Sequence, residues 1–268
     1  MRTLPFADYS FKTVPSVICI GVFDGMHLGH QRIVDETVSL ARDLEAQSVV
    51  ITFSVNPKMA RQSAPDMPAL QSRSDLEEIL ADRGVNYHCV IDFSSDMSKL
   101  SGEEFIALLC TSYEVRAMVV GDSFKVGARA NSAGPAEINS LLSKYTSSAY
   151  LRVIPPVVID NEVVSSSLIR RCLLTGEMDK ASRLLGRAYS LDLRSLKATA
   201  ENLKDASQTR LLYDVRTLGL LLPKAGKYMV EATAEGISLK GEAFVSEDHL
   251  ALELPVRMTP DGITFLGA

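Results

Sequence analysis

From Ser16 to about Leu185, the sequence alternates short runs of β-branched residues with amphipathic stretches. Five of these runs have the composition of strands and are apolar on both sides: 16–22, 48–53, 87–93, 117–121 and 149–154. Strands that are apolar on both faces are typical of a parallel sheet covered by helices, and alternating strand and helix patterns build βα units. We therefore predict an α/β fold with a Rossmann-like parallel sheet.

Two helix starts are signalled by capping boxes, in which Ser is followed three residues later by Glu. These are Ser74-Asp-Leu-Glu77 and Ser101-Gly-Glu-Glu104, and each directly precedes a segment with helical apolar periodicity. In such a box the serine side chain and the glutamate side chain satisfy each other's backbone N–H groups. We expect helices to begin at both serines.

The pattern of apolar and polar residues changes after Gly186. The polar stretch 193–206 can be interpreted as a helix. It is followed by short segments of alternating polarity at 210–215, 227–233, 249–254 and 262–265. Alternation over four to eight residues is typical of half-buried strands. We predict two domains, an α/β domain over residues 1–186 and a small, mostly β domain over residues 187–268.

Charge and cysteine usage exclude several classes of protein. Lys and Arg total 28 against 33 Asp and Glu, a net charge of −5, so we expect no nucleic-acid partner. Cys19, Cys89, Cys110 and Cys172 lie far apart and form no Cys-x-x-Cys pair, which disfavours zinc sites and disulfides. The N-terminus lacks the apolar core of a signal peptide, and stretches without charge such as 13–23 are shorter than a membrane span. We expect a cytoplasmic protein with no membrane partner.

The chemistry is concentrated in the segment Gly21-Val-Phe23-Asp24-Gly25-Met-His27-Leu-Gly29-His30, between the first predicted strand and the following amphipathic helix. Such a corner, at the carboxyl edge of a parallel sheet, is where open α/β folds bind ligands, and the N–H groups of the helix attract an anion. Glycines allow close backbone approach, and two imidazoles can donate hydrogen bonds to phosphate oxygens. The segment predicts a phosphate site.

The local sequence around His27 and His30 allows two other interpretations. The pair could simply occupy a helix start whose glycines shape a turn. A zinc pair on a helix usually has its histidines four residues apart, whereas these two are three apart, and no third ligand is evident because His88 and His249 are isolated. We interpret the pair as phosphate ligands and leave any metal ligands unassigned.

The motif Gly-x-Phe-Asp-Gly-x-His-x-Gly-His resembles the signature of the nucleotidylyltransferase superfamily, and in this full form it is similar to the bacterial FAD synthetase (FMN adenylyltransferase) family. Three further segments resemble motifs of that family in the same order and spacing, together covering roughly residues 17–191. They are Thr52-Phe-Ser-Val-Asn56-Pro57, Val120-Gly121-Asp122-Ser123-Phe124-Lys-Val-Gly127 and Val164-Ser165-Ser166-Ser167-Leu-Ile-Arg170.

The resemblance implies that the phosphate of FMN attacks the α-phosphorus of ATP, so that FAD forms and pyrophosphate leaves without a covalent enzyme intermediate. It implies ATP and FMN as small-molecule substrates and Mg²⁺ bound with ATP, and it leaves the oligomeric state open. The implied catalytic residues are His27, His30 and Arg170. The implied ATP site comprises Gly21, Phe23, Asp24, Gly25, His27, Gly29, His30, Ser166, Ser167 and Arg170. The implied flavin side comprises Asn56, Gly121, Asp122, Ser123, Phe124 and Gly127.

Several of these residues also have purely structural interpretations. The serines at 165–167 are typical of an ordinary helix N-cap, Phe124 is equally compatible with the core, and Asp24 before a glycine is a common turn former. The chain also departs from the family pattern. Asn56 stands where the family has His, Ser123 replaces an acidic or amide residue, and Ser167 and Leu168 replace Thr and Arg.

The departures at Asn56 and Ser123 keep two alternatives open. One is a nucleotidylyltransferase that uses another phosphorylated acceptor or CTP. The other is a protein that binds flavin or nucleotide and has lost turnover. In two-domain members of the family, the C-terminal half is a riboflavin kinase with a Gly-Phe-Pro-Thr-Ala-Asn segment. Here Arg216-Thr-Leu-Gly219 runs directly into Leu220-Leu-Leu-Pro223 and the segment is missing, so we predict a degenerate kinase-like domain without kinase activity.

Overall fold

The computed structural model describes residues 1–6, 12–54, 67–92, 97–202, 209–256 and 258–267. The chain divides into two compact units. The first comprises Met1–Phe23, Gly29–Met67 and Glu77–Val157, and the second comprises Asp24–Leu28, Pro68–Leu76 and Val158–Ala268. Two short pieces of the N-terminal half thus belong to the second unit. The domain boundary at residue 186 stays a prediction.

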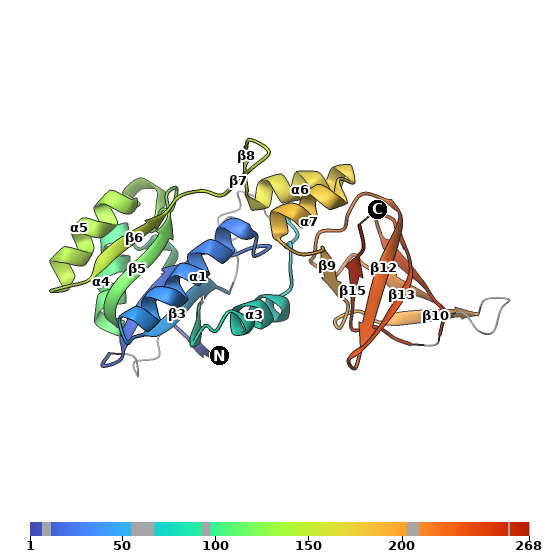
Figure 1. Ribbon diagram of the computed structural model, residues 1–268, viewed down its shortest axis with the longest axis horizontal. Helices are drawn as coiled ribbons and strands as arrows, with labels where there is room; N and C mark the ends of the chain where they lie inside the picture. Colours follow the sequence, from blue (N-terminus) through green and yellow to red (C-terminus); the bar gives the residue numbers. More distant parts are fainter. Residues whose placement is uncertain (7–11, 55–66, 93–96, 203–208, 257, 268) are drawn as a thin grey trace. The chain divides into compact units, whose positions relative to one another are not determined.

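The first unit is built on a six-stranded parallel sheet in the order β1-β4-β3-β2-β5-β6 (Figure 1). Its strands are β1 (Arg2–Pro5), β2 (Pro15–Ile20), β3 (Gln47–Phe53), β4 (Tyr87–Ile91), β5 (Glu114–Gly121) and β6 (Tyr150–Ile154). Along the chain, β2 pairs first with β3 on one side and later with β5 on the other. The strand order therefore reverses between β2 and β5, the kind of position where ligands of open α/β sheets bind.

Helices cover both faces of this sheet. They are α1 (Leu28–Asp43), α3 (Arg73–Asp82), α4 (Gly102–Ser112) and α5 (Pro135–Tyr145), with short 3₁₀ turns at Met97–Lys99 and Arg129–Asn131. In β2, Ile18 packs into one cluster with Ile106 of α4 and Ile138 of α5. The next side chain, Cys19, points the other way and hydrogen bonds Thr37 of α1. This alternation fixes which side chains a strand presents to each layer.

The five strands predicted for this half are confirmed, and the structure adds β1, which sequence periodicity missed. The expectation that every strand is covered on both faces was wrong for β6. Tyr150 and Val153 are each 41% exposed, because β6 lies at the edge of the sheet and pairs with β5 alone. The predicted α/β class with a following β domain is confirmed.

Of the two predicted helix starts, the second is confirmed. Ser101 caps α4, with its hydroxyl accepting from Glu104 N–H and the Glu104 carboxylate accepting from Ser101 N–H. The first helix is also present, as α3 begins at Arg73, but its predicted capping box was wrong, because the reciprocal pair is Ser72 with Asp75. The hydroxyl of Ser74 instead donates to Asp192 Oδ2 at 2.8 Å. The serine predicted to cap the helix thus binds a carboxylate 118 residues away in the sequence.

The second unit contains a small hairpin, two helices and an antiparallel sheet. The hairpin and helices are β7 (Val158–Ile159), β8 (Glu162–Val163), α6 (Ser166–Thr175) and α7 (Met178–Leu185). The sheet has the order β10-β11-β14-β13-β12-β15-β9. Its strands are β9 (Ser190–Asp192), β10 (Ala198–Asn202), β11 (Thr209–Asp214), β12 (Gly226–Ala234), β13 (Ile237–Val245), β14 (His249–Leu254) and β15 (Gly262–Phe265).

Four strands predicted for this region are confirmed as β11, β12, β14 and β15, whereas β9, β10 and β13 were missed. The helical interpretation of 193–206 was wrong, since Ala198–Asn202 forms β10, and 203–206 lie outside the described residues. A polar strand such as β10 carries no apolar alternation, so periodicity alone cannot separate it from a surface helix. Its pairing with β11 decides the matter.

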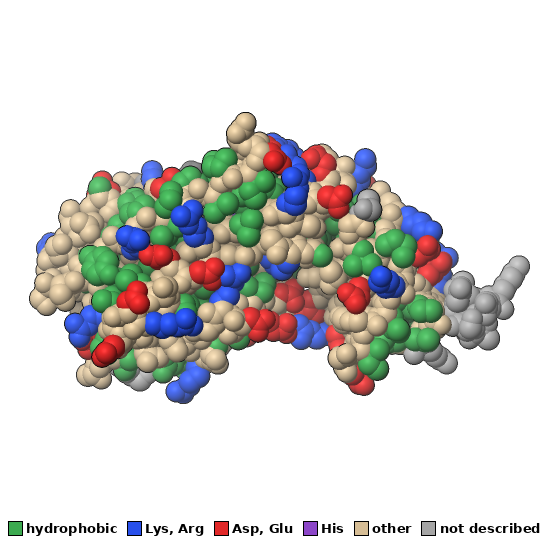
Figure 2. Space-filling view, in the orientation of Figure 1, with side chains coloured by type: hydrophobic (Ala, Val, Ile, Leu, Met, Phe, Trp, Pro, Cys, Tyr) green, Lys and Arg blue, Asp and Glu red, His purple; other side chains and the backbone are tan. Residues whose placement is uncertain are grey.

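None of the four cysteines forms a disulfide, and Cys19, Cys89 and Cys172 are buried as expected. Burial raises the pKa of the Cys19 thiol to about 12 and that of Cys110 to about 11, so neither is a thiolate at neutral pH. Within the described part of the chain, no helix combines the length and apolar composition needed to cross a bilayer. Basic and acidic side chains are interspersed over the face of each unit that Figure 2 shows.

Candidate functional site

The turn that follows β2 has an unusual backbone. Phe23, Gly25 and Met26 all have positive φ angles, of 49°, 82° and 36°. Non-glycine residues rarely adopt such angles, and when they do the surrounding structure must hold them there. The turn leads directly into α1, whose first residue is Leu28. Backbone strain at a strand-to-helix corner is typical of a functional loop.

In the first unit, Gly21 and Phe23 shape the surroundings of His30. A Cβ atom at Gly21 would lie only 3.1 Å from the Phe23 ring, so a side chain at position 21 would crowd that ring. The buried Phe23 ring meets the His30 ring edge-on, with a centroid distance of 5.3 Å and an interplanar angle of 79°. The predicted residues at 21, 23 and 30 thus form one packed group, in which the aromatic ring fixes the imidazole.

In the second unit, Asp24 ties three chain segments together. Its Oδ1 accepts a hydrogen bond from Leu70 N–H at 2.8 Å, and its Oδ2 accepts one from Arg170 Nη2 at 2.7 Å. The same Arg170 nitrogen donates to the Pro68 carbonyl at 2.7 Å. Both side chains of the ion pair are largely buried, with 12% of Asp24 and 14% of Arg170 exposed. Asp24 therefore does more than form a local turn: it links the 24–28 loop to segment 68–70 and to α6.

The three serines before Arg170 have three different environments. Ser165 is the N-cap of α6, and its hydroxyl accepts from Leu168 N–H. Ser166 Oγ donates to the backbone carbonyl of Asp24 at 2.8 Å. Ser167 is exposed at the first turn of α6. The N-cap interpretation is thus confirmed for Ser165, while Ser166 holds the 24–28 loop and Ser167 presents its hydroxyl outward.

His27 is buried in this loop, with 6% of its surface exposed. Burial lowers the pKa of its imidazole to about 4, an effect that the nearby Asp24 carboxylate opposes and Arg187 reinforces. His27 is therefore neutral at physiological pH, with one ring nitrogen as a donor and the other as an acceptor. It can donate a hydrogen bond to an anion without adding a charge.

Arg187 contacts the same loop and was not singled out by the sequence. Its Nη1 donates to the carbonyls of Gly25 at 3.1 Å and Met26 at 3.3 Å, and its Nη2 donates to Gln71 Oε1 at 3.0 Å. Its position directly after Gly186, the left-handed residue that ends α7, is the only local signal it carries. Helix and strand periodicity relate residues only a few positions apart, so they could not predict a contact between residues 187 and 25.

The residues predicted for the flavin side lie at the carboxyl end of β5, beside β2 in the sheet. Asp122 and Ser123 are exposed, whereas Phe124 is partly buried against the hydrophobic core of the first unit. Gly127 has a structural reason to be glycine: its φ is 95°, and a Cβ there would lie 2.3 Å from Gly102 N. Asn56 lies outside the described residues.

The structure thus brings Asp24 and Gly25 together with Ser166 and Arg170, although 146 residues separate Asp24 from Arg170. Gly29 lies at the second position of α1. Among the described residues, no group of three or more His, Cys, Asp or Glu side chains is arranged to hold a metal ion. In the second unit, the N-terminus of α6, the serine hydroxyls, the His27 imidazole and the Arg170 guanidinium are all groups of the kind that bind anions.

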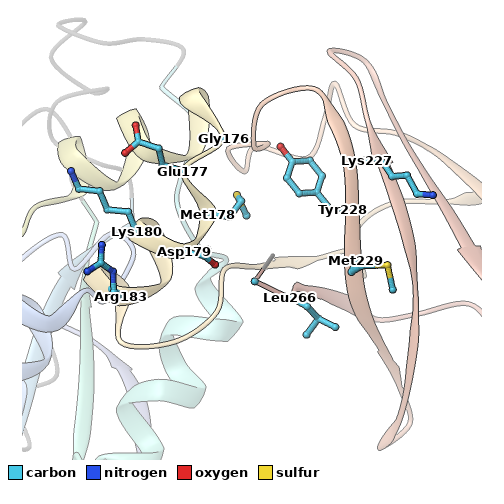
Figure 3. A pocket seen from close by; sticks show the side chains of 11 residues that line it. Gly176, Glu177, Met178, Asp179, Lys180, Arg183, Lys227, Tyr228, Met229 and Leu266 are labelled. Atoms are coloured by element: carbon cyan, nitrogen blue, oxygen red, sulfur yellow. The ribbon is translucent and has the colours of Figure 1, made fainter.

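A cavity of about 610 Å³ lies elsewhere in the second unit, between α7 and β12 (Figure 3). Met178, Tyr228 and Leu266 contribute apolar surface to it. None of the residues predicted from the sequence lines this cavity. Its cations are already paired, Lys180 with Glu162 and Lys227 with Glu242, so it shows no feature that selects a ligand.

Comparisons with known proteins show the family to which the chain belongs. A model of the FAD synthetase family matches residues 11–168, more than half of the 268-residue chain. A bifunctional riboflavin kinase/FMN adenylyltransferase from Listeria monocytogenes is 25% identical over 94% of this chain and 80% of its own length. A protein described as FAD synthetase from the same organism is 29% identical over 65% of this chain and 70% of its own length.

A bifunctional riboflavin kinase/FMN adenylyltransferase from Buchnera aphidicola is 28% identical over 67% of this chain, and the match spans 57% of that relative's length. Among solved structures, one described as a macrolide-efflux protein from Streptococcus pneumoniae superposes with a TM-score of 0.81 at 22% identity. It covers 99% of this chain and 89% of the other. At that identity the similarity concerns the fold alone.

Proposed function

The chain belongs to the FAD synthetase family, and on that premise we propose that it is an FMN adenylyltransferase, a nucleotidyltransferase that joins AMP from ATP to FMN. The observation that carries the proposal is the bond between the two phosphate-binding motifs. Asp24, inside the first motif, pairs with Arg170, which ends the last motif. One triphosphate can then contact the 24–28 loop and the start of α6 together.

We assign the phosphate contacts from the geometry of each side chain. Ser167 is exposed on the first turn of α6, where its hydroxyl and the helix N–H groups can bind phosphate oxygens. Arg170 uses only Nη2 for Asp24 and Pro68, and its buried Nε–H has no acceptor among the described residues. The guanidinium therefore keeps donors for the pyrophosphate. His27 adds a further donor from the 24–28 loop, and the family motif assigns His30 the same role.

The reaction needs positioning more than covalent chemistry. A phosphate oxygen of FMN forms a bond with the α-phosphorus of ATP while the bond to the bridging oxygen of the β-phosphate breaks, so pyrophosphate carries away the electron pair. No protein nucleophile takes part. The chain's own groups hold the two substrates in line and donate hydrogen bonds to the oxygens that gain charge. A neutral His27 suits this role, because it donates without needing a proton from solution.

Mg²⁺ is the metal that the family implies, and the residues present fit an ion that arrives with ATP. Mg²⁺ usually keeps several waters and binds through one or two carboxylates plus substrate phosphates. Asp24 is the carboxylate nearest the phosphate site in the sequence motif, and both of its oxygens already have partners. We propose that the substrate phosphates and water supply most of the ligands of the ion. When bound, the ion neutralises charge that develops on the phosphates.

The acceptor is assigned by the family and by the location of Gly121 to Gly127 at the carboxyl end of β5. Exposed Asp122 and Ser123 are available to a ligand there, and Phe124 is held partly by the core. The replacements at Asn56 and Ser123 keep another phosphorylated acceptor, or CTP as donor, as an outcome of the test. We place the reaction in the cytoplasm, where ATP is available and unpaired thiols remain reduced.

We also propose that residues 187–268 have no riboflavin kinase activity. Between the end of β11 at Asp214 and the start of β12 at Gly226, the chain makes a turn in which Leu218 N–H donates to the Val215 carbonyl. Leu220 and Leu221 then pair with Ala69. The short connection contains no Pro-Thr-Ala-Asn sequence: its threonine, Thr217, precedes Gly219, and it has no asparagine.

The test is a chromatographic assay of the purified full chain with Mg²⁺ and ATP, offered FMN or riboflavin. We expect FAD and pyrophosphate from FMN, and no FMN from riboflavin. An ATP analogue with a methylene between the α- and β-phosphorus atoms is the matched control, since it binds but cannot release pyrophosphate. FMN made from riboflavin would refute the proposal on the second domain. Product from CTP or from another phosphate acceptor alone, or ATP binding without pyrophosphate, would refute the adenylyltransferase assignment.

A further inference from the structure

The 24–28 loop is held from a segment far along the chain. Arg187 stands between α7 and β9, and its guanidinium spans the carbonyls of Gly25 and Met26 on one side and the Gln71 side chain on the other. The contact joins residues 162 positions apart in the sequence. Charge-assisted hydrogen bonds of this kind are stronger than neutral ones, and the rigid fork of a guanidinium fixes the position of what it binds.

A second connection reaches the same loop through residues 68–70. Ala69 forms a parallel bridge with Leu220: Ala69 N–H donates to the Gly219 carbonyl, and Leu221 N–H donates to the Ala69 carbonyl, both at 2.8 Å. The next residue, Leu70, donates its N–H to Asp24. The connection between β11 and β12 therefore holds Ala69, and Ala69 places the group that binds Asp24.

The loop needs such support because of its own backbone. Gly25 and Met26 both have positive φ, and the two carbonyls that Arg187 binds belong to these strained residues. Without a partner, a carbonyl in this turn would have to turn toward water, and the peptide planes on either side of it would rotate with it. His27 follows immediately, so its imidazole would move as well. A displacement of about 1 Å in a positioning group can cost roughly 100-fold in rate.

We infer that Arg187 is a positioning residue for adenylyl transfer, and that Arg187 and residues 219–221 of the small β domain together fix the 24–28 loop for ATP. The inference rests on the proposed function. It gives the C-terminal domain a part in the reaction that requires no kinase chemistry. Arg187 acts through the loop and not by contact with the phosphates.

The first experiment compares Arg187→Gln and Arg187→Lys with a matched control, Arg216→Gln, in the full-length chain. Arg216 lies in the same domain, pairs with Asp214 on the surface and is 65% exposed. For Arg187→Gln we expect kcat to fall about 30-fold or more and KM for FMN to change less than about twofold. Lysine keeps the charge but not the fork, so Arg187→Lys should recover only part of kcat. The Arg216 variant should match the wild type.

A second experiment reads the loop without activity. Hydrogen–deuterium exchange of Arg187→Gln should rise at residues 24–28 and 68–71 and stay at wild-type rates in β2 and β12, and ATP alone should protect residues 24–28 less than in the wild type. A wild type that makes no FAD would overturn the proposed function, while this exchange pattern would still decide the role of Arg187. Wild-type kcat in Arg187→Gln, equal losses in Arg216→Gln, or increased exchange throughout the second unit would overturn the inference.

Discussion

Arg170 Nη2 lies 2.7 Å from Asp24 Oδ2, and both side chains are more than four-fifths buried. The ion pair joins the glycine-rich turn after β2 to the helix that carries the serine motif. A buried pair costs desolvation when it forms, but breaking it by removing one partner leaves an uncompensated charge. This contact is therefore where stability and ATP binding should be most closely linked.

Asp24→Asn should lower both the stability of the fold and the affinity for ATP. The amide oxygen can still accept from Leu70 N–H, but Arg170 loses its counter-charge, so we expect the free energy of unfolding to fall by about 2–3 kcal/mol and KM for ATP to rise. The comparison is Asp160→Asn, whose pair with Arg183 is exposed at both side chains, 54% and 59%, and should matter by less than about 0.5 kcal/mol. Thermal unfolding with and without ATP measures both effects, and equal melting temperatures for the two variants would contradict the prediction.

Ser165→Ala and Ser167→Ala should separate helix capping from phosphate binding. Ser165 caps α6, so its loss should cost about 1 kcal/mol of stability with little change in KM for ATP. Ser167 is exposed, so its loss should leave stability within about 0.5 kcal/mol and lower kcat/KM for ATP about 10-fold. Chemical denaturation and steady-state kinetics on both variants check this. The reverse pattern would mean that Ser167 does not contact ATP.

Gly25→Ala should be worse than an ordinary glycine replacement at positive φ. At φ 82°, the new Cβ would lie 2.9 Å from Leu70 Cδ1, next to the N–H that binds Asp24. Gly236→Ala provides the control, since its φ is 79° and nothing lies within 4 Å of the new Cβ. We expect about 1 kcal/mol of destabilisation at Gly236 and at least about 2 kcal/mol at Gly25. Comparable losses in urea unfolding would show that the loop accommodates the methyl group.

His27 should make stability depend on pH in one direction. Burial lowers its pKa from the ordinary 6.5 to about 4, so between these values the unfolded chain binds a proton that the folded chain does not. Stability contributed by this group is complete above pH 6.5 and is lost as the pH falls, by about 2 kcal/mol at pH 5. In urea unfolding, His27→Asn should lose less free energy of unfolding between pH 7.5 and pH 5 than the wild type, by about the same 2 kcal/mol.

His30→Ala should remove most adenylyl transfer while leaving the fold intact, with a loss of roughly 100-fold or more if it stabilises the phosphate charge. Arg170→Ala should also lose transfer, but with reduced stability, because Asp24 would then be buried without its cation. FAD formation and circular dichroism melts measured on each variant distinguish the two. Near-normal turnover in both would refute the site.

The strand-to-helix corner after β2 could be predicted because its signals are local. The end of a strand, three glycines and a helix start lie within ten residues of each other. The capping box of α4 was predictable for the same reason, because Ser101 and its partner Glu104 are three residues apart. The same logic failed at Ser74. Its neighbours allowed a capping box, yet Asp192 offered a better acceptor from another part of the chain. Asn56 lies outside the described residues, so its assignment stays a prediction.

The sequence by itself determined the alternation that makes a parallel sheet, the strand-to-helix corner after the first predicted strand, and the residue types able to bind a triphosphate. Only the tertiary structure decided which serine caps α6 and which holds the loop, that Asp24 pairs with Arg170, and that Arg187 supports Gly25. The physical reason is distance along the chain. Periodicity and caps act between residues a few positions apart, whereas a hydrogen bond between residues 146 or 162 positions apart depends on how every intervening element packs.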